Sequence, residues 1–276
     1  MHITFCGTGL PAVNPKRACA GIVVQNDNVG FMLDCDPGTV QNAIASGVPL
    51  DQLRAVFLSH LHLDHVFCVT ELLTRLALLE FPLPSIYGPS GTRKYMDSAS
   101  DFARTALGYM GGGLFQKSLA PVDVLETLPG DKRVVEGVHI QSEEVPHVAN
   151  LQAQARRFRI DGLSIVYSGD ARSAPEIMVD LARDADVLIH SCYTNAGLEA
   201  SLATLNPERA DRMREHNKSV HCSLLEVARI AHEAGVNTLV LTHLLPTESE
   251  DQIITEAEET FGGKVVVAHD GLVLKV

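Results

Sequence analysis

Four side chains able to bind a metal are concentrated in the stretch Ser59-His60-Leu61-His62-Leu63-Asp64-His65. The apolar run Ala55-Val56-Phe57-Leu58 directly before it has the length and β-branched content of a buried strand, so the stretch is expected at a strand-to-helix turn. Two ligands spaced i, i+2 converge on one metal only where the backbone is extended or turning, because a helix would splay them. His60 and His62 therefore suit one ion, and Asp64 and His65, on the following turn, suit a second.

The order of these residues resembles the His-x-His-x-Asp-His signature of the metallo-β-lactamase superfamily. The segments Ile3–Gly9 and Phe31–Cys35 narrow the resemblance to the branch that contains ribonuclease Z and the arylsulfatase-like hydrolases, and the match continues to the C-terminus. Members usually carry glycine three residues after the last motif histidine, where this chain has Cys68. A polar turn that is merely rich in histidine is the alternative, but the preceding strand supplies the context that such a motif requires.

Further metal-capable residues follow short apolar strands later in the chain. His147 comes after two or three strands expected between Val122 and Val145, Asp170 after Ile165–Gly169, and His243 after Leu239–Thr242. Strand ends gathered at one edge of a sheet are where α/β proteins assemble their sites.

The resemblance implies a role for each of these residues. It assigns His60, His62 and His147 to one zinc ion, Asp64, His65 and His243 to a second, and Asp170 as the bridge between the two. His147 as a surface histidine and Asp170 as an ordinary turn residue are the alternatives for each taken alone. Nitrogen and oxygen donors of this kind suit two Zn²⁺ per chain, with Mn²⁺ or Fe²⁺ as alternatives.

The resemblance also implies catalytic residues beside the metal ligands. Asp64 and His221 are expected to take part in catalysis. His190 and Ser191 are expected to lie next to the metal ligands without binding a metal themselves. In ribonuclease Z-like proteins a strand ends in His-Glu, whereas here it ends in His190-Ser191. Ser191 cannot serve as an acid near neutral pH, so His221 would have to donate a proton without a carboxylate partner, or only orient the substrate.

Alternating strand and helix patterns in both halves of the chain predict an α/β fold. The resemblance implies a four-layer αββα sandwich, the metallo-β-lactamase fold, and the lack of an obvious linker favours a single domain over residues 1–276. Asp270-Gly271 between two apolar runs is typical of a hairpin turn. Three antiparallel strands are expected between His2 and Asp34. Helices are expected over six segments, 38–47, 70–81, 91–109, 175–184, 223–234 and 248–261, with Gly235 and Gly262 as C-caps of the last two. The glycine-rich run Met110–Leu114 is expected to be a connector.

Composition excludes several classes of function. A net charge of −12 and a pI near 5.4 argue against general affinity for polyanions, and Arg156-Arg157-x-Arg159, the densest basic segment, is expected to be the solvated face of a strand. The six scattered cysteines are expected to be reduced. With no signal peptide and no apolar run long enough to span a membrane, the expected location is the cytoplasm.

These observations predict a zinc-dependent hydrolase of a small-molecule ester that acts through a metal-bound hydroxide and is arylsulfatase-like or phosphodiesterase-like. A lactonase or β-lactamase-like hydrolase and a metal-bound sensor without turnover are the alternatives. Ribonuclease Z proteins that grip tRNA insert a long arm between the counterparts of His147 and Asp170, and only 22 residues separate those positions here. We therefore expect no specific nucleic-acid partner and no membrane partner, while a homodimer is compatible with the sequence.

Overall fold

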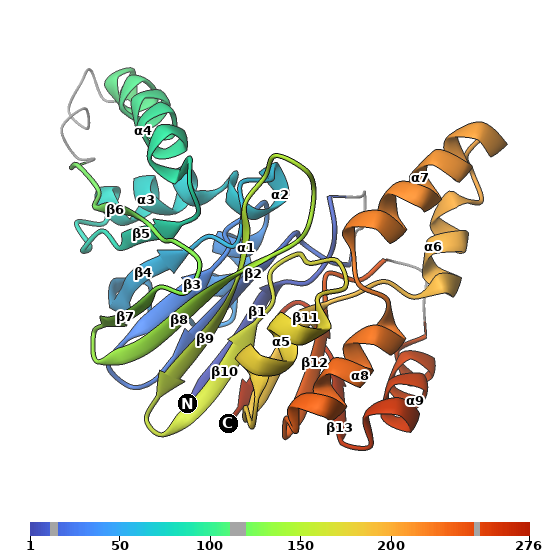
Figure 1. The fold of residues 1–276 in the computed structure, drawn as a ribbon. Helices are drawn as coiled ribbons and strands as arrows, with labels where there is room; N and C mark the ends of the chain where they lie inside the picture. Colours follow the sequence, from blue (N-terminus) through green and yellow to red (C-terminus); the bar gives the residue numbers. More distant parts are fainter. Residues whose placement is uncertain (12–15, 111–119, 246–248) are drawn as a thin grey trace. The chain divides into compact units, whose positions relative to one another are not determined.

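The structure is a computed structural model that describes residues 1–11, 16–110, 120–245 and 249–276 (Figure 1). The chain forms two compact units, each assembled from separate segments. The first comprises Met1–Gly7, Ala18–Thr127 and Asp270–Val276, and the second comprises Thr8–Arg17 and Leu128–His269. A single domain over the whole chain stays a prediction.

The first unit is built on a mixed sheet that has seven strands among the described residues. The strands β14, β1, β2 and β3 pair antiparallel, and β3, β4, β5 and β6 pair parallel. The three antiparallel strands expected near the N-terminus are therefore confirmed. In sheet order the strands are β14 (Val273–Lys275), β1 (His2–Gly7), β2 (Gly21–Gln25), β3 (Gly30–Leu33), β4 (Leu53–Phe57), β5 (Ser85–Gly88) and β6 (Val124–Glu126).

Helices pack on this sheet through an apolar core. Leu72, Leu73 and Leu76, spaced for one face of a helix, are buried in it together with strand residues such as Val56 and Ile86. The parallel strands place their carboxyl ends at one edge, and β4 delivers the histidine motif there. The helical segments are α1 (Thr39–Ala45), the 3-10 turn η1 (Leu50–Gln52), α2 (Leu63–Val66), α3 (Val69–Leu78) and α4 (Thr92–Gly108).

The second unit repeats this plan with another mixed sheet, again of seven strands in the described part of the chain. The strands from β7 to β10 pair antiparallel, and those from β10 to β13 pair parallel. In sheet order they are β13 (Lys264–Val267), β12 (Thr238–Thr242), β11 (Val187–Ser191), β10 (Leu163–Tyr167), β9 (Ala153–Ile160), β8 (Val138–Val145) and β7 (Lys132–Val135).

Three helices of this unit, α5 (Pro175–Ala182), α8 (Leu224–Ala234) and α9 (Glu250–Phe261), share a core with the sheet (Figure 1). The last two end on Gly235 and Gly262 in the left-handed conformation, as expected from the sequence. Two more helices, α6 (Asn195–Leu202) and α7 (Pro207–Val220), were not predicted. Among its residues α7 buries only Ala210 and Val220, so it lacks the apolar stripe that identifies a helix in a sequence.

Two further expectations are wrong, and one lies outside the described residues. Asp270-Gly271 does not turn a hairpin, because β13 pairs with β12 while β14 pairs with β1 in the other sheet. The Asp270 carboxylate instead accepts hydrogen bonds from Ala18 N (2.6 Å) and Asn42 Nδ2 (3.2 Å). Arg156 and Arg157 are not solvated but buried. Of the expected connector Met110–Leu114, residues 111–114 lie outside the described part. No described helix has both the length and the apolar character to cross a membrane.

Candidate metal centre

The first unit gathers three histidines and an aspartate just after β4. The rings of His60 and His62 have centroids 4.6 Å apart, and those of His60 and His65 are 4.1 Å apart. Asp64 lies in the first turn of α2, with its Oδ2 atom 3.7 Å from His65 Nε2. His62 is extended at the start of that helix, as the i, i+2 spacing required. We call these four residues the first cluster.

Asp34, directly after β3, accepts hydrogen bonds that orient residues of the first cluster. Its Oδ1 accepts a hydrogen bond from Ser59 N (2.7 Å), and its Oδ2 accepts from Ser59 Oγ (2.7 Å) and His65 Nδ1 (2.7 Å). Ser59 Oγ, having donated to the carboxylate, accepts in turn from His60 Nδ1 at 3.0 Å. Both imidazoles therefore carry their proton on Nδ1 and present the lone pair of Nε2, the tautomer that a metal ligand needs.

Asp34 lies within the segment Phe31–Cys35 that carries the resemblance, but no role was predicted for it. The available signal was a carboxylate ending the apolar run Phe31-Met32-Leu33, because a buried charge requires partners. Asp34 is fully buried and has a φ of 56°, a left-handed conformation that costs a residue other than glycine about 1 kcal/mol. Such strain persists only where the surroundings enforce it, and it is common at functional sites.

The second unit gathers its metal-capable residues around Asp170, and we call Asp170, His147, His221 and His243 the second cluster. Asp170 Oδ2 lies 3.4 Å from His243 Nε2, 3.9 Å from His221 Nδ1 and 4.0 Å from His147 Nε2. Asp170, His221 and His243 each offer a ligand atom within 4.8 Å of the others. His147 donates from Nδ1 to the carbonyl oxygen of Val220 (2.8 Å), which leaves its lone pair on Nε2, facing Asp170.

Local backbone geometry positions the second cluster. Gly169 has a φ of 57°, and its carbonyl oxygen accepts hydrogen bonds from Ser168 Oγ (2.6 Å) and Ser191 Oγ (2.9 Å), which fixes the turn that carries Asp170. His243 follows β12 directly and is also left-handed, with a φ of 57°. The next residue, Leu244, is tied to Thr8 by a backbone hydrogen bond of 3.1 Å.

His190 and Ser191, the two residues expected next to the metal ligands, are both buried. Ser191 braces the turn before Asp170, as described above. His190 lies inside β11 and donates from Nδ1 to the Ser191 carbonyl oxygen at 2.7 Å. Burial lowers the pKa of His190 to about 4, so the ring is neutral near pH 7. The negative charge of Asp170 partly opposes this shift, so the ring lies within electrostatic reach of the second cluster.

The residues present fit metal ligands. The donors are imidazole nitrogens and carboxylate oxygens, which suit zinc and related ions. In the second unit they converge from separate segments, whereas the first cluster comes from the single segment 60–65. The hydrogen bonds made by Asp34 and by the Val220 carbonyl oxygen orient the ligand rings, as such bonds do in metalloproteins.

Comparison with known proteins agrees with this geometry. A family model described as "Anti-Pycsar protein Apyc1" matches residues 1–240. A ribonuclease Z from Mycobacterium bovis is 31% identical, over 98% of this chain and 96% of its own. The crystal structure of the metallo-β-lactamase fold protein YhfI from Bacillus subtilis is similar with a TM-score of 0.75 at 23% identity, covering 99% of this chain and 98% of that one.

A diphosphatase of the PhnP family, also known from a crystal structure, has a TM-score of 0.68 at 17% identity, covering 100% of this chain and 97% of that one. These likenesses confirm the α/β metallo-β-lactamase fold expected from the sequence. The chain thus belongs to the Apyc1 family of the metallo-β-lactamase superfamily, in the branch that resembles ribonuclease Z, and is a metal-dependent hydrolase.

Proposed function

We propose that this hydrolase cleaves a small phosphodiester with the help of two zinc ions, to which both clusters supply ligands. The arrangement of three histidines around the Asp170 carboxylate, with the His147 tautomer fixed by a backbone carbonyl, is the observation that carries the proposal. The ligand assignment is the one that the resemblance implies: His60, His62 and His147 on one ion, Asp64, His65 and His243 on the other, and Asp170 on both.

The bound ions would supply Lewis-acid chemistry, lowering the pKa of a water and neutralising charge on the scissile group. The protein's own residues then have separate tasks. Asp34 and Ser59 hold the ligand rings in position, and the Gly169 turn presents the Asp170 carboxylate. We assign His221, half-buried beside Asp170, as the residue that holds a proton for the leaving group.

The names of the similar proteins favour a phosphate ester over a sulfate ester, a lactone or a β-lactam. A relative at 31% identity is a ribonuclease, and a structural neighbour is a diphosphatase, so both act on phosphate bonds. The net charge of −12 and the short segment between His147 and Asp170 favour a small substrate over tRNA. We further propose that the protein acts in the cytoplasm, as a homodimer.

Cleavage of RNA is the second candidate, and a specific observation favours it. The identity to proteins named ribonuclease Z extends over nearly the whole of both chains, so the likeness is not confined to the metal ligands. Incubation with a labelled tRNA precursor distinguishes the candidates. Site-specific cleavage of that RNA at a rate above that of a small diester would refute the choice of a small substrate.

The test of the proposed function is hydrolysis of bis(p-nitrophenyl) phosphate, with and without a chelator. We expect zinc-dependent turnover that the chelator abolishes and that p-nitrophenyl sulfate does not support. His60→Ala in the first cluster and Asp170→Asn in the second should each abolish it, because each removes a ligand. Activity that survives in either variant would show that the catalytic centre lies elsewhere.

The exposed Asp97→Asn, in α4, is the matched control and should retain full activity. Metal analysis of all variants separates loss of ions from loss of folding, which circular dichroism monitors. Ions retained in Asp170→Asn at the level of the natural chain would contradict its assignment as a ligand.

A further inference from the structure

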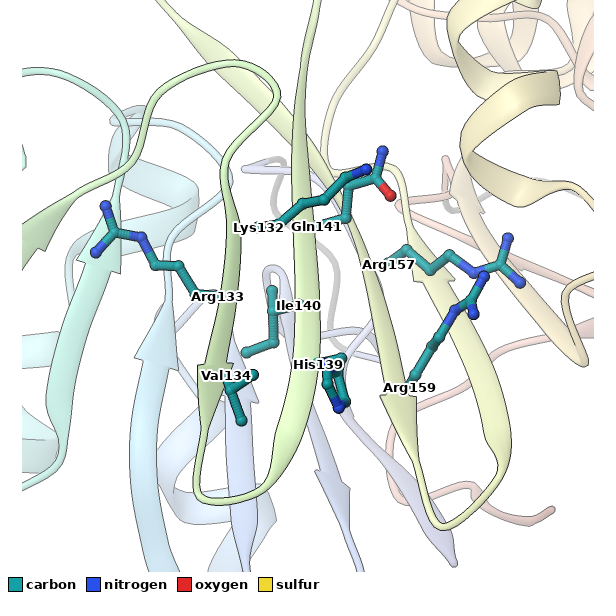
Figure 2. A pocket seen from close by; sticks show the side chains of 8 residues that line it. All are labelled: Lys132, Arg133, Val134, His139, Ile140, Gln141, Arg157 and Arg159. Atoms are coloured by element: carbon teal, nitrogen blue, oxygen red, sulfur yellow. The ribbon is translucent and has the colours of Figure 1, made fainter.

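A basic hollow of about 430 Å³ lies on the antiparallel strands β7, β8 and β9 of the second unit (Figure 2). None of its lining residues belongs to either metal cluster. Four of them are lysine or arginine in a chain whose net charge is −12, and a fifth is His139. This local concentration of positive charge in an acidic protein therefore requires a separate explanation.

Strand register shows which of these side chains share one face. Lys132 pairs with Gln141, which pairs with Arg157, and Val134 pairs with His139, which pairs with Arg159. Side chains at paired and alternate positions point to the same side of a sheet. Arg133 pairs with Ile140 and so points to the other side, as Figure 2 shows, where it bonds Asp131 at 2.9 Å. We call the side chains that share the hollow the basic face: Lys132, His139, Gln141, Arg157 and Arg159.

The helix α5 covers part of this face. Ala153 and Ala155, on the same side of β9 as Arg157, belong to the core that α5 shares, and Arg157 donates to the Leu181 carbonyl oxygen in the last turn of α5. Lys132, His139 and Arg159 remain exposed. Exposed cations on an edge strand commonly prevent sheets from joining, and this accounts for Lys132 on β7. It does not account for Arg157 and Arg159, which lie two strands inward on β9.

The exposed members of the basic face have no compensating partner within the described part of the chain. Lys132, His139 and Arg159 make no side-chain hydrogen bond or ion pair there. Arg157 is 8% exposed and gives its Nη1 to the carbonyl oxygens of Leu181 (3.0 Å) and Arg183 (2.7 Å), while its buried Nε has no partner there. Burial first, and then the nearby charge of Arg159, lower the pKa of Arg157, while the charges of Asp184 and Asp186 act in the opposite direction.

Arg157 and Arg159 repel each other, an unfavourable arrangement that an anion bound on the face would relieve. Two acidic groups nearby already have hydrogen-bond partners. Glu143 accepts a hydrogen bond from Gln141 Nε2 (2.9 Å), and Asp186 accepts from Ser164 N (2.8 Å). Planar guanidinium groups match phosphate oxygens in pairs, and this chemistry favours phosphate over a carboxylate or a halide.

The size of the hollow limits how large a phosphate compound can bind there. Three strands about 4.8 Å apart and two rungs about 7 Å apart give a footprint of about 10 by 7 Å. With a volume near 430 Å³ this suits a ligand the size of a mononucleotide. A nucleic-acid strand would need a longer track of cations, on a protein less acidic than this one.

We propose that the basic face is a binding site for a small phosphate ester with two or more negative charges, of mononucleotide size. The site stands apart from the chemistry assigned to the metal clusters, so it offers a place where a nucleotide could be sensed without being cleaved. The proposal does not depend on the proposed substrate, because its evidence lies entirely in β7, β8 and β9.

Isothermal titration calorimetry with two probes, inorganic pyrophosphate and the non-hydrolysable α,β-methylene analogue of adenosine diphosphate, tests this at about 0.15 M salt. We expect saturable binding that Lys132→Gln and Arg159→Gln each weaken about tenfold, the factor that one charge-assisted hydrogen bond contributes. Both side chains are exposed, so neither change should unfold the protein. Tighter binding of the nucleotide analogue than of pyrophosphate would show that the nucleoside contributes; equal affinity would show that the phosphates suffice.

Arg209→Gln, which removes an exposed charge from α7 in the same unit, is the matched control and should bind both probes unchanged. His60→Ala should also retain binding, which separates this site from the metal clusters. No binding of either probe below millimolar concentration, or equal affinities in all variants, would overturn the proposal. Binding of a single-stranded RNA, but of neither small probe, that is lost in Lys132→Gln and Arg159→Gln would overturn the assignment to a small ligand.

Discussion

Replacement of Asp34 by asparagine is the most informative change that the structure suggests. The carboxylate is fully buried and accepts three hydrogen bonds of 2.7 Å: two from Ser59 and one from His65 Nδ1. Asparagine has the same shape, but one of its two terminal atoms is a donor. Wherever that amide group is placed, it faces either the Ser59 backbone N–H or the atoms bonded to Oδ2.

Each orientation damages the first cluster in a definite way. If the amide nitrogen faces Ser59 N, two donors meet, and a buried unsatisfied donor costs about 1–3 kcal/mol. If it faces His65 Nδ1, it donates to that atom and moves the ring proton to Nε2, the atom expected to bind the metal. Loss of such an orienting partner typically costs about 10–100-fold in metal affinity or activity, equivalent to about 1.4–2.8 kcal/mol.

We therefore expect Asp34→Asn to weaken zinc binding about 10–100-fold, with a similar loss of bis(p-nitrophenyl) phosphate hydrolysis at limiting zinc. Zinc affinity is measured by competition with a chromogenic chelator, and stability by urea unfolding. Ser59→Ala, which removes one donor to Asp34 and the acceptor for His60, should show a smaller loss, and Asp97→Asn none. Zinc affinity and activity equal to the natural chain in Asp34→Asn would refute this account of the first cluster.

Three further predictions concern metal, pH and leaving group. Protein purified without chelator should contain about two zinc ions per chain with no thiolate ligand, which elemental analysis and X-ray absorption spectroscopy can check; a sulfur ligand would contradict the donor set. The pKa of His190 falls from 6.5 to about 4 on folding, so the unfolded chain takes up the proton first as the pH falls. The free energy of unfolding should therefore drop by about 2 kcal/mol between pH 7 and pH 5, and His190→Asn should remove that drop in urea unfolding. Across a series of diesters, turnover should depend steeply on leaving-group pKa, and a flat dependence would show that proton delivery is complete.

Residues that carry their own local signal could be predicted from the sequence. The histidine motif after β4 and the strand ends at Asp170 and His243 were identifiable because apolar runs of strand length lead directly into them. The glycines at the ends of α8 and α9 were identifiable because left-handed C-caps favour that residue.

Features that depend on long-range pairing could not be read in this way. Asp34 and His65 are 31 residues apart, and no local pattern indicates that they bond. The Asp270-Gly271 pair has the composition of a hairpin turn, but which sheet a strand joins is decided by the whole fold and not by the turn. Likewise Arg156 and Arg157 were expected to be exposed because charged side chains usually are, whereas tertiary contacts bury both of them.

The departure at Ser191 connects the fold to the expected chemistry. In related proteins the resemblance places an acid at this position, whereas here the Ser191 hydroxyl is committed to the Gly169 carbonyl oxygen and is 1% exposed. A side chain bonded there braces the turn that carries Asp170 and cannot share a proton with His221. General acid catalysis by His221 would then lack a carboxylate relay in this position, and such catalysis contributes about 10²–10⁴-fold. Esters whose leaving groups depart without a proton lose least from this change, so we expect an activated diester to be turned over fastest at the proposed site.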